Sequence, residues 1–180
     1  MNKDINELNK DINIVGLHWI ERWRVNNGKH QSYVIPFATT YPINIVYHGK
    51  SEFKYGQYGI HLGQQDTLTF LGDKKQKILA KFIDCRKNSP TFKSELSLEI
   101  TPSSARTLII PPGVAHTFSH LENVFTLNSY SLFLPTIEQL ANETLNWSPN
   151  NDVINLPEDI DINEIEGYEP MTEEASALDR

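Results

Sequence analysis

The segment that most constrains the fold of this chain is residues 108–118, Leu-Ile-Ile-Pro-Pro-Gly-Val-Ala-His-Thr-Phe. Proline fixes φ and glycine accepts a positive φ, so the first apolar run must end as a strand and turn before the second begins. The turn places His116 near the start of the second strand, where its side chain can point into the mouth of a barrel. We therefore expect a ligand site at this position.

Short apolar runs separated by turn signals recur along most of the chain. Residues 94–100, Ser-Glu-Leu-Ser-Leu-Glu-Ile, alternate polar and apolar side chains with a period of two, which is typical of a half-buried strand. Turn signals such as Asn26-Asn27-Gly28-Lys29 and Asn88-Ser89-Pro90 interrupt the runs. Strands are expected within residues 12–20, 32–37, 43–47, 58–62, 67–71, 78–84, 94–100, 107–110 and 123–133. This pattern predicts an all-β sandwich or jelly roll, with a short helix only at residues 136–145.

Charge divides the chain near residue 149. Residues 150–180 contain ten Asp or Glu and one Arg, whereas the whole chain has a net charge of −7, so residues 1–149 are mildly basic. We predict a jelly-roll domain over residues 1–149 and an acidic C-terminal extension over residues 150–180. The basic body can accept an anionic ligand. Because it has no Lys/Arg stripe interleaved with aromatic residues, we expect no nucleic-acid partner.

The sequence also indicates a cytoplasmic protein with no membrane partner. No run of about 18 apolar residues is present, and the polar N-terminus lacks the apolar core of a signal peptide. The single cysteine, Cys85, excludes an intrachain disulfide. Although Asp84 and Arg86 flank it, we interpret Cys85 as a half-buried strand thiol rather than a nucleophile.

Three segments carry a family resemblance: Tyr-Gly-Ile-His-Leu at residues 58–62, residues 82–92 with Asp84, Arg86 and Ser-Pro-Thr-Phe, and Ile-Pro-Pro-Gly-Val-Ala-His-Thr-Phe at residues 110–118. In order and spacing they resemble motifs of the dTDP-4-keto-6-deoxyhexose (dTDP-4-dehydrorhamnose) 3,5-epimerases, nucleotide-sugar epimerases of the cupin superfamily. The resemblance covers about residues 12–160, with weaker matches at Leu145-Asn146-Trp147 and Asn155-Leu156-Pro157.

This resemblance implies a cupin double-stranded β-helix that forms a homodimer, binds a nucleotide-linked keto sugar and uses no cofactor. In such a family a histidine removes the proton α to the C4 ketone, a tyrosine acts as acid, and basic residues steady the enolate. The catalytic histidine corresponds to His61. The family's tyrosine corresponds to Leu127, its lysine to Thr67, and its arginines to Tyr58 and Asn27.

The family's histidine-orienting aspartate has no clear counterpart in the sequence. The nearest match places Ala175 there, with Glu173 or Glu174 as an imperfect substitute. The chain thus keeps the base and lacks the acid and most of the cationic residues.

We therefore predict His61 as the catalytic base and His116, Asp84, Arg86, Tyr58 and Tyr130 as substrate-binding residues. Each has a simpler interpretation. His61 and His116 can be satisfied structural histidines, and Asp84 and Arg86, two residues apart, can form an ion pair instead of lining a cavity. Tyr58 and Tyr130 lie at odd offsets from His61 and Leu127, which favours packing or dimer contacts over proton donation. His120 is expected to be exposed.

Three functions remain open from the sequence. The leading hypothesis is an epimerase-like cupin that isomerises a nucleotide-linked 4-keto-6-deoxy sugar. The alternative is a diverged cupin without epimerase activity, which is a binding or accessory protein or an isomerase, lyase or cyclase in a specialised pathway. The least supported is a metal-dependent cupin oxygenase, because the chain has no His-x-His pair. Its makeshift ligands would be His61, His116, Gln64, Gln65 and Asp66, and we predict no metal.

Overall fold

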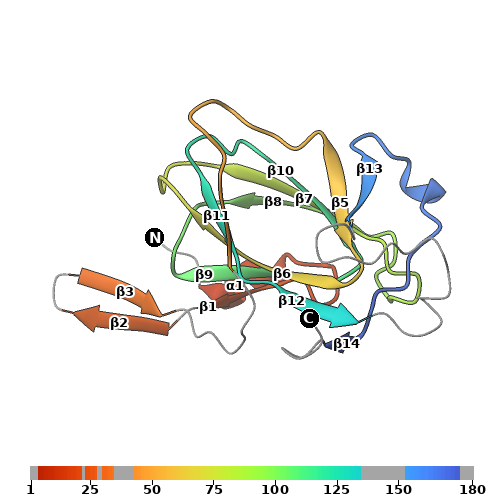
Figure 1. Ribbon diagram of the computed structural model, residues 1–180, viewed down its shortest axis with the longest axis horizontal. Coiled ribbons are helices and arrows are strands. Elements are labelled where there is room, and N and C mark those ends of the chain that lie inside the picture. The colour runs from red at the N-terminus through yellow and green to blue at the C-terminus, as the bar shows by residue number, and fades with distance from the viewer. Residues whose placement is uncertain (1–3, 22, 28–29, 35–42, 135–152, 175–180) are drawn as a thin grey trace.

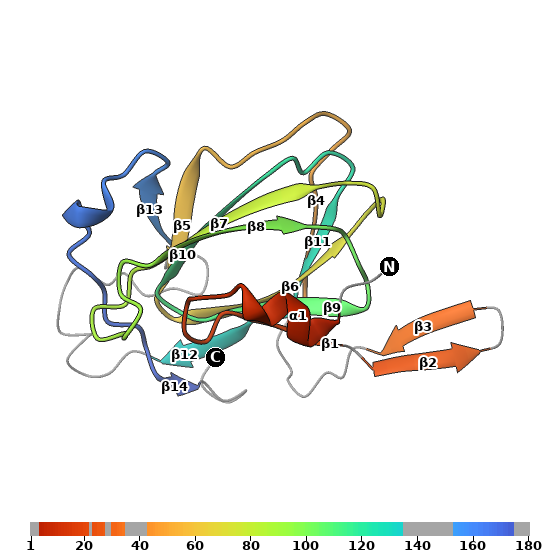
Figure 2. The same ribbon diagram turned by 180° about the vertical axis from the view of Figure 1, so that it is seen from behind.

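A computed structural model describes residues 4–21, 23–27, 30–34, 43–134 and 153–174. Almost all regular structure in this part of the chain is β, in antiparallel pairs (Figures 1 and 2). The prediction of an all-β jelly roll is confirmed. Within the described residues, neither helix has the length and apolar character needed to cross a membrane.

Two antiparallel sheets face each other across the core (Figure 1). The first is ordered β1 (His18–Glu21), β9 (Arg106–Ile110), β6 (Gln64–Leu71), β11 (Phe125–Asn128) and β4 (Asn44–Tyr47), with β12 (Ser131–Leu134) on β6 and β14 (Glu173–Glu174) on β12. The second is ordered β13 (Val153–Pro157), β5 (Gln57–His61), β10 (Val114–Ser119), β7 (Ile78–Asp84) and β8 (Glu95–Ile100). A separate hairpin of β2 (Trp23–Asn27) and β3 (His30–Val34) projects from one end of the barrel (Figure 2).

The core between the sheets follows the period-two pattern of the strands. On β10, Val114 and Phe118 point inward, whereas Ala115 points to the opposite face of the sheet. The main cluster combines apolar side chains from both sheets, including Phe70, Phe82 and Leu108. His116 shares the inward-facing side of β10 with Val114 and Phe118, so alternation alone aims it between the sheets.

The Pro-Pro-Gly turn forms as predicted between β9 and β10. Gly113 adopts a φ of 81°, a conformation that L-residues with a Cβ adopt only at a cost. Its backbone N–H donates to the carbonyl of His61 over 2.7 Å, and its carbonyl accepts from the N–H of Cys85 over 3.1 Å. The turn is therefore tied directly to the ends of β5 and β7.

The N-terminal part of the expected strand at residues 12–20 differs from the prediction. The strand β1 begins only at His18, and it is preceded by a helix that was not predicted, α1 (Ile5–Lys10). The Asp4 side chain caps this helix by accepting from the backbone N–H of Asn6, and Ile5 and Leu8 pack against the core. A single short turn of helix offers too few apolar positions for a periodic signal.

The acidic segment after residue 150 packs on the barrel over its described part. Strand β13 pairs with β5, and a 3-10 helix (Ile162–Glu164) follows. Ile165 is buried with Ile60 and Cys85 on the outer face of the second sheet. The backbone of Tyr168 exchanges hydrogen bonds with Cys85 and Lys87. The boundary at residues 149/150 stays a prediction, and the helix expected at residues 136–145 lies outside the described residues.

Candidate functional site

A cavity of about 440 Å³ opens between the two sheets on the side where β4 and β11 face β5 and β10. Two histidines and one buried carboxylate line it together: His61 from β5, His116 from β10 and Asp66 from β6. The two imidazole rings lie 5.9 Å apart between centroids, at 32° to each other. The structure thus brings the predicted base and a predicted substrate-binding residue into one site.

His61 faces the cavity because its strand neighbours face the other way. Ile60 and Leu62 are buried in the cluster on the outer side of the second sheet, opposite to His61. Gly59, two residues before His61, also lines the cavity and pairs with His116 across β5 and β10. A Cβ at Gly59 would lie 3.5 Å from Cγ1 of Val153, which also lines the cavity.

His116 is held by contacts at both ring nitrogens. Its Nδ1 lies 3.2 Å from the carbonyl oxygen of Val114, and its Nε2 lies 3.2 Å from Oδ2 of Asp66. A carbonyl and a carboxylate can only accept, so each of the two contacts calls for an N–H on the ring. This arrangement directs Nε2 of His116 at the carboxylate.

Asp66 is the central group of the site, and it is only 3% exposed. Its Oδ1 accepts from the amides of Gln64 and Asn128 over 2.6 and 2.7 Å, and its Oδ2 faces both histidines, with Nε2 of His61 at 3.9 Å. Burial opposes ionisation of Asp66. The hydrogen bond from His116 and the nearby charges of the two imidazoles outweigh it, so the pKa of Asp66 lies below its ordinary value.

The role of Asp66 was missed at the sequence level, where it entered only as one of five makeshift metal ligands. The expected carboxylate was sought near residue 175. Glu173 and Glu174 instead form β14 beside β12, and Ala175 lies outside the described residues. The sequence did carry a signal for Asp66. Gln64, Asp66 and Leu68 are spaced by two residues, so they share one face of a strand, and a carboxylate on a buried face needs hydrogen-bonding partners.

Tyr130 lines the same cavity, although its odd offset from Leu127 predicted that it would face away. The prediction took Leu127 to face the cavity, but Thr126, Asn128 and Tyr130 line it at even spacing and Leu127 is not among the lining residues. The other predicted tyrosine, Tyr58, is 5% exposed and packs in the cluster on the outer face of the second sheet. The structure therefore places Tyr58 on the opposite side of β5 from the cavity.

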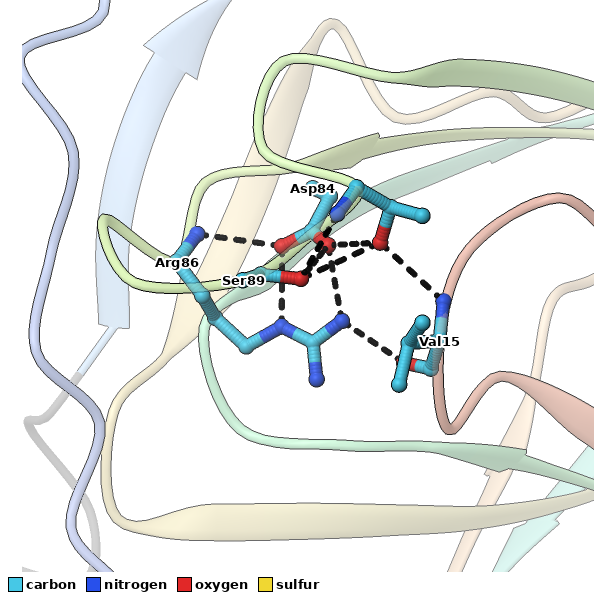
Figure 3. A network of polar contacts seen from close by, with 5 residues as sticks. Val15, Asp84, Arg86 and Ser89 are labelled. Carbon is cyan, nitrogen blue, oxygen red and sulfur yellow. Dashed lines mark hydrogen bonds and ion pairs between the residues drawn. The ribbon is translucent and has the colours of Figure 1, made fainter.

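Asp84 and Arg86 also lie away from the cavity and form a buried ion pair (Figure 3). Nε and Nη2 of Arg86 each donate to the carboxylate over 2.8 Å, and the hydroxyls of Ser89 and Thr91 each donate over 2.6 Å. Nη2 of Arg86 also donates to the carbonyl of Val15 over 2.6 Å. Of the two interpretations left open by the sequence, the geometry matches the structural ion pair.

Further polar groups line the cavity that sequence reasoning did not select. His48 contacts Thr126 through Nε2 at 2.9 Å, and burial lowers its pKa. Burial raises the pKa of the Tyr55 hydroxyl, which keeps it protonated at neutral pH. His48 could have been found from the sequence, since Asn44, Val46 and His48 are spaced by two residues along β4 and just beyond its end, and so share one face. His120, as expected, is exposed, and it pairs with Glu52 at 3.0 Å.

The sequence model of the dTDP-4-dehydrorhamnose 3,5-epimerase family matches residues 57–155, which contain all three members of the His61–Asp66–His116 cluster. The chain belongs to this family. A comparison with curated proteins by sequence finds no match.

Solved structures of epimerases and isomerases share the fold at low sequence identity. A dTDP sugar isomerase from Desulfovibrio desulfuricans aligns with a TM-score of 0.57 and 14% identity over 86% of this chain and 91% of that one. The dTDP-4-dehydrorhamnose 3,5-epimerase from Bacillus anthracis, with TDP and pyrophosphate bound, gives 0.54 and 16% over 71% and 78%. A mutant of the 3,4-ketoisomerase QdtA from Thermoanaerobacterium thermosaccharolyticum, in complex with TDP-4-keto-6-deoxyglucose, gives 0.50 and 16% over 68% and 84%.

Few charged side chains line the described part of the cavity. Apart from Asp66 and the histidines, the polar side chains that line it are amides and hydroxyls, such as Gln57, Tyr55 and Tyr130, and no Lys or Arg is among the described lining residues. The described lining side chains that can carry a charge near neutral pH are thus Asp66 and the three histidines, His48, His61 and His116.

Proposed function

We propose that this chain isomerises a nucleotide-linked 4-keto-6-deoxy sugar and that His61 removes the proton α to the ketone. The observation that carries the proposal is the His61–Asp66–His116 cluster at the cavity of a chain that belongs to the epimerase family. Histidine suits this step because its ordinary pKa lies near neutral pH, where it can both take up and release a proton.

The proton transfer can be followed atom by atom. Nε2 of His61 accepts the proton from the carbon next to the ketone, and the C–H electron pair moves to give an enolate with its charge on the C4 oxygen. The buried carboxylate of Asp66, 3.9 Å from Nε2 of His61, stabilises the imidazolium that forms. Return of a proton to the same carbon restores the ketone, and delivery to the opposite face inverts the centre.

Two tyrosines of the cavity are candidates for the proton donor. The chain has Leu127 where its family resemblance places a tyrosine, and Tyr55 and Tyr130 line the cavity from other positions. A tyrosine is protonated at neutral pH and can donate to a carbanion or to an enolate oxygen.

The relatives support the proposed substrate class. The Bacillus anthracis epimerase holds TDP, and the Thermoanaerobacterium ketoisomerase holds TDP-4-keto-6-deoxyglucose. The same class of compound is the first substrate to test here. The neutral lining supports one second candidate, a diverged family member that binds such a ligand without exchanging its protons. For either function we expect a cytoplasmic homodimer.

Deuterium exchange with the solvent distinguishes the isomerase from the binding protein. Incubation of the protein with dTDP-4-keto-6-deoxyglucose in D₂O is expected to add deuterium next to the ketone, as measured by mass spectrometry and NMR. The His61→Asn variant should lose this exchange. The His120→Asn variant, altered at an exposed histidine, should retain it. Unchanged exchange in His61→Asn would contradict the assignment of the base, and binding of TDP without any exchange would favour the binding protein.

A further inference from the structure

We propose that His61, Asp66 and His116 form a binding site for one divalent transition-metal ion, with its remaining coordination positions open to the cavity. The proposal concerns the side chains of this chain and does not depend on which sugar it binds. Within the described residues, these three side chains place one donor atom each within 4.8 Å of one another.

The distances between the donor atoms suit a common ion. Ligands bound about 2.0–2.2 Å from a metal, at tetrahedral or octahedral angles, lie roughly 3–3.5 Å from each other. Nε2 of His116 and Oδ2 of Asp66 already have this separation, at 3.2 Å. Nε2 of His61 lies 3.9 Å from the same oxygen, and all three donor atoms lie within 4.8 Å of one another, so small side-chain movements would bring them to ligand spacing.

The groups behind the three side chains orient them toward a shared point. Gln64 and Asn128 occupy Oδ1 of Asp66, which leaves Oδ2 directed at the imidazoles. The Val114 carbonyl lies 3.2 Å from Nδ1 of His116, so Nε2 is the ring nitrogen that faces Asp66. Metal-binding histidines in proteins are commonly fixed by such a contact from their second nitrogen.

The donor set suits a cation. The carboxylate of Asp66 supplies negative charge, and Nε2 of each imidazole can supply a lone pair. Two imidazoles and one carboxylate suit zinc, iron, nickel and manganese, and three protein ligands leave positions for water or a ligand.

A bound ion has a consequence for the proposed function. The metal would use the same lone pair on Nε2 of His61 that the base needs, so the metal-loaded state and the proton-abstracting state exclude each other. This consequence rests on the proposed function: a site-bound ion should inhibit deuterium exchange, and chelation should restore it. Metal binding itself does not depend on the proposed proton transfer.

Titration of the metal-free full-length protein with Co²⁺ tests the site, because bound Co²⁺ shows visible d–d absorption that reports its ligands. Calorimetry with Zn²⁺ gives the affinity. We expect one ion per chain, and at least about tenfold weaker binding in His61→Asn and in Asp66→Asn. Asp66→Asn preserves the shape of the side chain and its contacts with the amides. The control is His120→Asn, which removes an exposed histidine paired with Glu52 and keeps a residue type that tolerates its φ of 60°.

Each outcome decides the proposal. Stoichiometric binding that the two site variants weaken and the control retains supports it. Failure of the wild-type protein to bind Co²⁺ or Zn²⁺ overturns it, as does equal affinity in folded Asp66→Asn, with folding checked by circular dichroism. Deuterium exchange measured on the metal-free protein keeps the two proposals apart: exchange without metal binding overturns only the metal site, and metal binding without exchange overturns only the proposed function.

Discussion

Replacing Asp84 by asparagine removes the charge at the centre of the polar network in Figure 3 while keeping the shape of the side chain. The carboxylate is fully buried and accepts from the backbone and guanidinium of Arg86 and from the hydroxyls of Ser89 and Thr91. In the variant, the new N–H₂ group faces donors where an acceptor is needed. We expect a large loss of stability.

The magnitude follows from the geometry of the pair. Breaking a buried ion pair by removing one partner costs about 3–5 kcal/mol, since the other charge stays buried without compensation. The side chain of Arg86 is only 15% exposed, so solvent cannot replace the carboxylate. At about 2–4 °C per kcal/mol for a chain of this size, the melting temperature should fall by about 6–20 °C. The double variant Asp84→Asn/Arg86→Met should lose less than Asp84→Asn alone, because no unpaired cation remains.

The pH dependence gives the prediction a second test. Burial opposes ionisation of Asp84. The hydrogen bonds from Arg86, Ser89 and Thr91 outweigh it and lower the pKa of Asp84 in the folded state. A depressed folded pKa means that the stabilisation is fully present above the unfolded pKa, about 3.9, and is lost as the pH falls through the folded value. The gap between wild type and Asp84→Asn should therefore narrow in acid.

Urea unfolding followed by circular dichroism, at pH 7 and at steps toward acid, measures both effects. A variant within about 1 kcal/mol of the wild type at pH 7 would refute the claim that the network stabilises the barrel. A gap that stays constant into acid would refute the explanation based on the ionised carboxylate.

Three further predictions concern single positions. Gly113→Ala should cost about 2 kcal/mol or more in urea unfolding, because alanine is strained at a φ of 81° and its Cβ would lie 2.5 Å from Cγ of Arg86; wild-type stability would contradict this. Cys85 should resist alkylation in the folded protein and react in urea, because burial raises the pKa of its thiol to about 12; rapid reaction of the folded protein would show that the site opens. Tyr58→Phe should leave deuterium exchange unchanged, since Tyr58 packs on the face of β5 opposite the cavity. A large loss of exchange would show that Tyr58 takes part in the reaction.

Much of the architecture could be predicted from local patterns in the sequence. The alternation at residues 94–100 became β8, and the Pro-Pro-Gly turn ended β9 and began β10. Strand β13 was not predicted, because its apolar residues alternate within an acidic segment and its pairing with β5 stabilises it. The prediction for Tyr130 failed because it took Leu127 to face the cavity, whereas the lining residues of this segment are Thr126, Asn128 and Tyr130.

The sequence by itself determined the β class, the turn before His116 and the opposed faces of His61 and its neighbours. These depend on φ preferences and on the period of two, which act over a few residues. Only the tertiary structure decided that the carboxylate of Asp66 faces both His61 and His116, and that Asp84 and Arg86 form an ion pair away from the cavity. The partners of Asp66 come from β5, β10 and β11, and only the packing of the two sheets brings these strands together around it.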